Sequence, residues 1–234
     1  NSGALRPEHG EQKMDTRETA LLLFVEMEKT KNFGSSLIRD TLNKYDYEDP
    51  REKAFLKRLT EGTLESLLTL DYVINAYSKT PTNKMKPLIR SLLRLSVYQI
   101  LYMDTVPDSA ACNEAVRLAK KKGFERLSGF VNGVLRTITR NKEEILNSES
   151  AFWQELQKNP VQALSVRYSV PEWMISLWEA QYGEEKTEPM LERLKNGRPL
   201  TIRLDSRLTE EEKVQEIAAV SYTHLRAHET LMNL

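Results

Sequence analysis

The segment from Pro87 to Met103 is rich in Leu, Ile and Tyr and leaves one polar stripe, which carries Arg90 and Arg94. A helix that is apolar over most of its circumference has to be covered by other elements on nearly every side. The stretches around it, between Thr16 and Asn196, repeat apolar residues at helical spacing. The sequence therefore predicts a helical bundle with this helix at its centre.

Six further helices are expected before residue 142. Asp49 followed by Pro50 is typical of a helix start, whereas three lysines followed by Gly123 are typical of a helix end. The expected helices are Thr16 to about Lys31, Ser35 to Tyr45, one opening at Pro50, one around Tyr72 to Tyr77, one from the turn at 106–109 to Gly123, and Leu127 to Asn141.

The composition changes after Asn141. Shorter helical pieces are expected there, and all three tryptophans, at positions 153, 173 and 178, are expected to pack in a core or between domains. The pieces are interrupted at Pro160, Pro171, Gly183 and Pro189. Pro199 to Leu204 then alternates like a strand, and Thr209 with Glu212 forms a capping-box pattern. The predicted fold class is all-α: a helical bundle, a helical linker and the first strand and helix of an incomplete α/β domain.

Length and composition are those of a globular protein, with 234 residues of which 40% are hydrophobic. No run of about 18 apolar residues occurs, so no membrane span is expected. The first residues lack the apolar core of a secretory signal. A single cysteine, Cys112, excludes an internal disulfide and a cysteine-cluster metal site. We expect a cytoplasmic monomer with no metal and no membrane partner.

Charge is unevenly spread, although the formal net charge is zero. Between Lys79 and Arg140 there are twelve basic and four acidic residues, so the rest of the chain carries the compensating negative charge. This asymmetry favours a polyanionic partner for one half of the molecule. A solvated helix face without a partner is the alternative.

The stretch from Val106 to Arg140 resembles the last helices of the NusB-like helical domain. That domain carries a proline, then Asn-Glu-Ala-Val, then Gly-Phe-Val-Asn-Gly-Val-Leu-Arg. The pattern matches at Pro107, at residues 113–116 and at residues 129–136, and the segment from Ile89 to Met103 is similar to the central helix of the family. The resemblance covers about Thr16 to Asn141 and implies a NusB-like bundle that binds RNA.

The continuation after Asn141 separates two kinds of protein with such a domain. A transcription antitermination factor, which binds RNA and a ribosomal protein, would end near this point. This chain continues with a stretch similar to the linker of RsmB-type (Sun family) 16S rRNA cytosine-C5 methyltransferases. That resemblance implies S-adenosylmethionine as the cofactor of the parent protein and a cysteine thiolate as its nucleophile. Antitermination remains the alternative, and a helical protein-interaction scaffold without RNA affinity is a third hypothesis.

The chemistry implied by this resemblance is not expected in the chain itself. No glycine-rich cofactor turn occurs, and Cys112 is expected to be a small packed residue. We therefore predict no catalytic residue, no metal ligand and no cofactor in this fragment. His224 and His228 have the spacing of zinc ligands on a helix, but residues 220–230 resemble the translation of a sequencing adapter, so we interpret the pair as accidental.

The sequence accordingly divides into five parts. Residues 1–13 are expected to be a disordered or non-native leader, 14–145 the NusB-like RNA-binding domain, and 146–198 the helical linker. Residues 199–219 would begin a truncated methyltransferase region, and 220–234 would be adapter-derived.

RNA affinity comes largely from cations that neutralise phosphates, so basic residues are the candidate contacts. They are Lys79, Lys84, Lys86, Arg90, Arg94, Lys120, Lys121, Lys122, Arg126, Arg136 and Arg140. For Arg90 and Arg94, on the predicted central helix, a structural role inside the bundle is the stronger reading. The family-motif residues expected to be structural are Asn113, Glu114, Gly129, Phe130, Asn132 and Gly133. We expect Asn113, Glu114 and Asn132 to form a buried hydrogen-bond set, and the two glycines to let helices approach closely.

Overall fold

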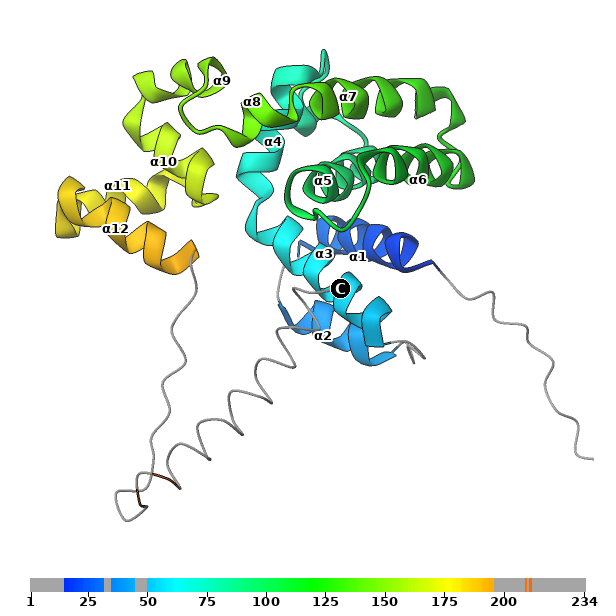
Figure 1. Cartoon of the computed structure of the whole chain (residues 1–234), viewed down its shortest axis with the longest axis horizontal. Coiled ribbons are helices and arrows are strands. Elements are labelled where there is room, and N and C mark those ends of the chain that lie inside the picture. The colour runs from blue at the N-terminus through cyan, green and yellow to red at the C-terminus, as the bar shows by residue number, and fades with distance from the viewer. Residues whose placement is uncertain (1–14, 32–34, 45–49, 196–208, 210, 212–234) are drawn as a thin grey trace, which may run out of the picture.

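The computed structural model describes residues 15–31, 35–44, 50–195, 209 and 211, and in this part of the chain every regular element is a helix (Figure 1). The bundle contains α1 (Thr16–Thr30), α2 (Ser35–Lys44), α3 (Pro50–Glu65), α4 (Leu67–Tyr77), α5 (Pro87–Tyr102), α6 (Asp108–Lys121) and α7 (Ser128–Arg140). The helices that follow are α8 (Lys142–Leu146), α9 (Ala151–Gln154), α10 (Pro160–Tyr168), α11 (Glu172–Tyr182) and α12 (Glu184–Lys195). Short 3-10 turns are η1 (Thr82–Lys84), η2 (Glu125–Leu127) and η3 (Leu156–Lys158).

Helix α5 lies at the centre of the bundle, as its composition predicts. It contacts α1, α3, α4, α6, α7 and α8, and eleven of its sixteen residues are buried. Leu93, Val97 and Ile100 are fully excluded from solvent. Burial of apolar surface at about 25 cal/mol per Å² is the main force that holds the other helices around α5. The all-α prediction is therefore confirmed for the described residues.

Local signals in the sequence set the helix ends. The Asp15 side chain accepts a hydrogen bond from the Arg17 backbone N–H and caps α1. Helix α5 opens on Pro87, whose missing N–H costs nothing in a first turn. After α6, Gly123 adopts a positive φ of 81°, and the Phe124 N–H returns to the Ala119 carbonyl at 2.8 Å. This glycine cap turns the chain sharply from α6 into α7.

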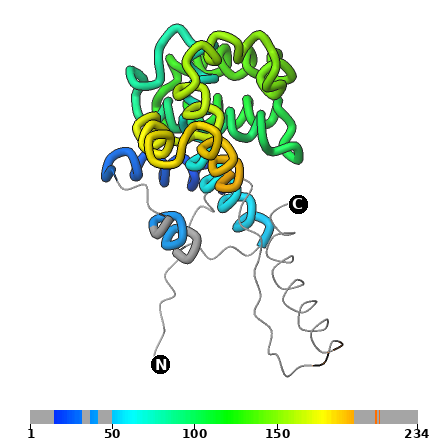
Figure 2. Tube along the Cα trace, turned by 90° about the vertical axis from the view of Figure 1, so that its left-hand side faces the viewer, coloured from blue at the N-terminus to red at the C-terminus, as the bar shows by residue number. Residues whose placement is uncertain are grey.

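The helices after Asn141 are held mainly to α4. The indole of Trp153 stacks on Tyr72 at 5.5 Å between ring centroids and donates to the Ile145 carbonyl at 3.0 Å. The Thr69 hydroxyl donates to the Val166 carbonyl, and the Leu68 N–H donates to the Ser169 hydroxyl. Figures 1 and 2 show α10, α11 and α12 gathered on one side of the bundle.

Two expectations for this later region have different outcomes. The packing role expected of tryptophan holds at Trp153 but is wrong for Trp173, which is 66% exposed. Helix α11 buries Ile175 completely, and a residue two positions earlier points to the opposite side of a helix. The predicted strand at Pro199 to Leu204 lies outside the described residues, as do residues 1–13 and 220–234.

Candidate nucleic-acid interface

Two of the predicted basic clusters meet at one end of the bundle. The Lys86 ammonium lies 5.6 Å from the centroid of the Phe124 ring, which joins the start of α5 to the turn between α6 and α7. This turn is at the right-hand end of the bundle in Figure 1. The exposed cations at this place are named here the basic end: Lys84, Lys86, Lys120 and Arg126. Lys86 and Phe124 are far apart in the sequence, so no local pattern predicts this contact.

The cations of the basic end are available to a ligand. Lys84, Lys120 and Arg126 are exposed, and none of them forms an ion pair with an acid among the described residues. Lys86 is exposed as well, and its described contact is the face of Phe124. Cations that are free of internal partners can neutralise phosphates without first breaking an ion pair.

Lys121 and Lys122 are adjacent to the basic end but point to an internal acid. Their ammonium groups lie 2.6 and 2.7 Å from the two carboxylate oxygens of Glu18, in the first turn of α1. Glu18 is only 3% exposed. Burial opposes its ionisation, but hydrogen bonds and charge from the two lysines outweigh burial and hold the pKa of Glu18 below its usual value.

Arg90 and Arg94 point into the bundle, where two acids neutralise them. Glu28 of α1 pairs with Arg90 at 2.5 Å and with Arg94 at 2.9 Å, and Asp71 of α4 pairs with Arg94 at 2.6 Å. Arg90 also donates to the Thr82 carbonyl at 3.1 Å. Hydrogen bonding to Glu28 raises the pKa of the Arg90 guanidinium, although burial opposes this. These arginines join α1, α4 and α5, which favours the structural reading over RNA contact.

Three further predicted contacts are exposed but are not joined to the basic end by a described contact. Arg136 and Arg140 project from α7, and Arg136 donates to the Asn132 side chain, one turn earlier, at 3.0 Å. Lys79 is exposed just after α4. These side chains can extend a basic surface, and no described contact joins them to the basic end.

The expected buried set of Asn113, Glu114 and Asn132 does not form. Asn113 is exposed, Glu114 accepts from Arg117 on its own helix at 2.8 Å, and Asn132 accepts from Arg136. Asn113 therefore faces solvent on α6, whereas Asn132 is partly buried on α7 and bonds within its own helix. Phe130 is partly buried against the core.

The close approach expected at Gly129 and Gly133 is also absent. Both are exposed, and a Cβ added at either would meet nothing within 4 Å. The close approach occurs instead at Gly62, where an added Cβ would lie 1.9 Å from the Tyr98 hydroxyl. Helix α3 crosses α5 there, and only a residue without a side chain fits.

Sequence reasoning missed the acids that decide which cations are free. Glu18 lies three residues before Leu21, and Glu28 lies seven residues after it. All three therefore share one face of α1. Carboxylates on a face otherwise made of Leu21 and Phe24 signal buried ion pairs, because an unpaired buried charge is strongly unfavourable. Their partners, however, are far away in the sequence and could not be read from it.

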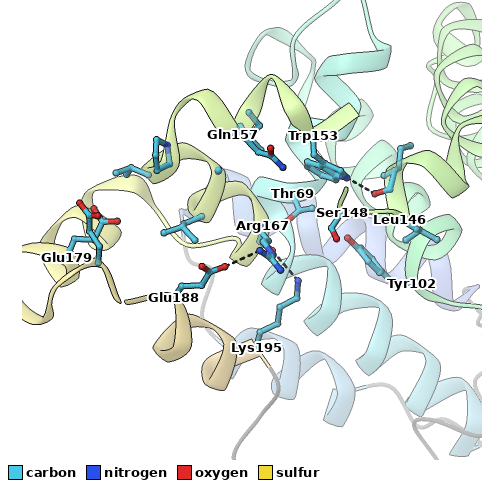
Figure 3. A pocket seen from close by; sticks show the side chains of 17 residues that line it. Thr69, Tyr102, Leu146, Ser148, Trp153, Gln157, Arg167, Glu179, Glu188 and Lys195 are labelled. Atoms are coloured by element: carbon cyan, nitrogen blue, oxygen red, sulfur yellow. Dashed lines mark hydrogen bonds and ion pairs between the residues drawn. The ribbon is translucent and has the colours of Figure 1, made fainter. Parts of the chain in front are cut away.

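Helices α8 to α12, with α4 and α5, line a cavity of about 660 Å³ that is open to solvent on one side. Figure 3 shows Trp153 and Tyr102 on one side of it, and Arg167 between Glu188 and Lys195 on the other. Arg167 donates to Glu188 at 3.0 Å, and Lys195 donates to the Arg167 carbonyl at 3.1 Å. The lining contains neither His nor Cys, so it presents no pair of nucleophile and imidazole base.

Cys112 does not fit the role of a nucleophile. It is 4% exposed, and its sulfur lies 3.9 Å from the Thr139 hydroxyl oxygen. Burial raises the pKa of the thiol, whereas a nucleophilic cysteine needs a lowered pKa. The expectation of a small residue packed between helices is confirmed. No glycine-rich turn between a strand and a helix occurs in the described residues, so they do not fit S-adenosylmethionine.

Two further findings concern metals and membranes. No group of three or more His, Cys, Asp or Glu side chains is close enough to hold a metal ion within the described ranges. The histidine pair at 224 and 228 lies outside them. Among the helices that the structure describes, none is both long and apolar enough to cross a membrane.

Known proteins resemble the chain over two different lengths. "Probable ribosomal RNA small subunit methyltransferase B" of Bacillus subtilis is 34% identical over 177 residues, which are 76% of this chain and 37% of that protein. "Transcription antitermination protein NusB" of Thermodesulfovibrio yellowstonii is 36% identical over 108 residues, which are 46% of this chain and 70% of that protein. The chain thus spans little more than a third of the Bacillus protein.

Fold and family follow from two further comparisons. The crystal structure of a protein named PH0851 shares the fold, with a TM-score of 0.57 and 16% identity over 88% of this chain and 45% of that one. The model of the NusB family matches residues 14–140, which is more than half of the 234 residues. The chain belongs to the NusB family.

Proposed function

We propose that the chain is the RNA-binding region of a cytoplasmic 16S rRNA cytosine-C5 methyltransferase that uses S-adenosylmethionine. The observation that carries this proposal is the length of the similarity. The family match ends at residue 140, but the similarity to the Bacillus methyltransferase B covers 177 residues and therefore includes helices beyond the bundle. The methyl transfer itself belongs to the parent protein, and this region contributes binding as a monomer.

The basic end supports the RNA part of the proposal. Its four exposed cations come from η1, the start of α5, the last turn of α6 and η2, so several elements contribute to one group of positive charges. Such a group suits the phosphates of a folded RNA, which are read by charge and shape. Antitermination is the second candidate, because the NusB relative is 36% identical over 108 residues and is matched over 70% of its own length.

A salt titration tests RNA binding. Anisotropy of a fluorescein-labelled hairpin from 16S rRNA would be measured with the whole chain at several salt concentrations. We expect log K to fall linearly with log salt, with a slope of about −0.7 to −0.9 for each phosphate that is neutralised. An affinity that is independent of salt contradicts the proposal.

Paired substitutions locate the contact. Lys86→Gln together with Lys120→Gln should weaken binding. The slope of log K against log salt should also become shallower, by the amount expected for the loss of about two phosphate contacts. Lys186→Gln together with Arg193→Gln on α12 is the matched control, because both cations are exposed but lie in the acidic region after Asn141. Equal effects of the pair and the control would place the RNA elsewhere.

Sequencing the gene downstream of residue 219 separates the two candidates. A cofactor-binding glycine turn and further cysteines in the same reading frame support the methyltransferase. A stop codon directly after this point supports the antitermination factor.

A further inference from the structure

Glu18 contacts two lysines at the end of α6, and these two lysine side chains differ in their exposure to solvent. The Lys121 side chain is 48% exposed, the Lys122 side chain is 23% exposed, and the Glu18 side chain is 4% exposed. The two ammonium groups occupy different oxygens of one carboxylate. Glu18 therefore keeps one cation if the other leaves.

The two lysines differ in what their departure would cost. Loss of the more buried Lys122 would leave Glu18 with a partner that is half in water. Loss of Lys121 would leave the buried carboxylate with its better-shielded partner, and the ammonium would move only into solvent or onto a ligand. Because Glu18 keeps the ion pair with Lys122, release of the half-exposed Lys121 does not leave the buried carboxylate without a partner.

Lys121 also lies beside the free cations. Lys120 precedes it and has no ion pair among the described residues, and Arg126 follows after the Gly123 turn. A phosphate held by Lys120 or Arg126 would lie within reach of a lysine side chain on the same turn. An anion at this place and the Glu18 carboxylate thus compete for one ammonium group.

We propose that Glu18 is an internal competitor of RNA: it holds Lys121 in the free protein, and a phosphate takes Lys121 over in the complex while Lys122 stays with Glu18. The inference rests on the proposed RNA binding and adds Glu18 as a residue that limits the affinity for RNA. Glu18 is a positioning residue, because it acts on RNA only through Lys121.

The test uses the same labelled 16S hairpin and the whole chain. Glu18→Gln should tighten binding by about two- to fivefold, because the half-exposed Lys121 becomes available to a phosphate without first leaving a carboxylate. Glu125→Gln is the matched control, because it removes one negative charge from an exposed acid at the same end of the bundle. The smaller effect expected of Glu125→Gln measures how much RNA affinity rises when one negative charge is removed from this end of the bundle.

A double-mutant cycle decides whether the effect passes through Lys121. In the Lys121→Gln background, Glu18→Gln should change affinity no more than Glu125→Gln does. A gain that persists in this background, or a Glu18→Gln effect equal to the control, overturns the proposal.

A second variant covers the case in which Glu18→Gln does not fold. Lys121→Gln alone should weaken RNA binding although Lys121 is ion-paired in the free protein, and an unchanged affinity contradicts the exchange. Absence of salt-dependent binding by the unaltered chain would instead refute the proposed function. Circular dichroism melts of each variant separate binding effects from unfolding.

Discussion

The bundle of α1–α7 and the helices α8–α12 are built from the same kind of element but are stabilised differently. In the bundle, α5 contacts five other bundle helices, and its two arginines are neutralised by the buried Glu28 and the partly buried Asp71. In the later helices, Trp173, Leu177 and Leu194 are more than half exposed. Charge differs as well, because residues 142–195 carry ten acids and six bases. A common helical pattern therefore gives a buried core in one region and leaves large apolar side chains exposed in the other.

Core truncation should give the largest difference between the regions. Leu93 in α5 and Ile175 in α11 are both fully buried. Leu93→Ala should destabilise the whole bundle by about 3–5 kcal/mol, because the cavity opens among helices that cannot collapse onto it. Urea unfolding followed by circular dichroism measures this loss.

Ile175→Ala should act locally instead. We expect faster amide hydrogen exchange in α10–α12 with little change in α5, because these helices can open while the bundle stays folded. Equal loss of protection in α5 would show that the two regions unfold as one unit and would contradict this expectation.

The acids of the two regions provide the second contrast. Glu28→Gln removes the common partner of Arg90 and Arg94, which are 17% and 12% exposed, and should cost about 3 kcal/mol. Glu188→Gln breaks a pair with Arg167 in which both side chains are about half exposed, and should cost less than about 1 kcal/mol. Thermal melts of both variants check the order, and a larger loss for Glu188→Gln would contradict it.

Acid should affect the bundle through Glu18. The pKa of this carboxyl is lowered in the folded protein from an ordinary value of 4.5. Its stabilising contribution is therefore complete above the ordinary value and is lost as pH falls through the lower, folded value. The free energy of unfolding, measured between pH 6 and pH 3, should decline less in Glu18→Gln than in the unaltered chain. Parallel curves would contradict the paired state of Glu18.

The smallest effect is expected at the surface of α11. Trp173→Gln should change stability by no more than about 0.5 kcal/mol, because its ring is largely in water. Trp153→Gln is the contrasting variant, since it removes the stacking on Tyr72 and the hydrogen bond to Ile145. A large loss at position 173 would mean that a further part of the chain covers this face.

Much of the bundle could be predicted because its signals are local. The helix starts at Thr16, Pro50 and Pro87 and the end near Gly123 follow from caps and from apolar spacing within a few residues. The close approach of helices predicted at Gly129 and Gly133 is absent. A glycine in a helix allows another helix to come close but does not require it. The approach at Gly62 depends on Tyr98, 36 positions later, and on how α3 crosses α5.

The sequence by itself determined that the chain is helical, that the helix from Pro87 is central and that residues 14–140 carry the family pattern. These properties depend on spacing within one helix and on the order of residues. The tertiary structure alone decided which cations face outward. Arg90 lies 62 positions from Glu28, and Lys121 lies 103 positions from Glu18. Whether such groups meet depends on how α1 packs against α5 and α6. An ion pair forms only when the two charged groups lie within a few ångströms of each other, and no local sequence pattern specifies that distance.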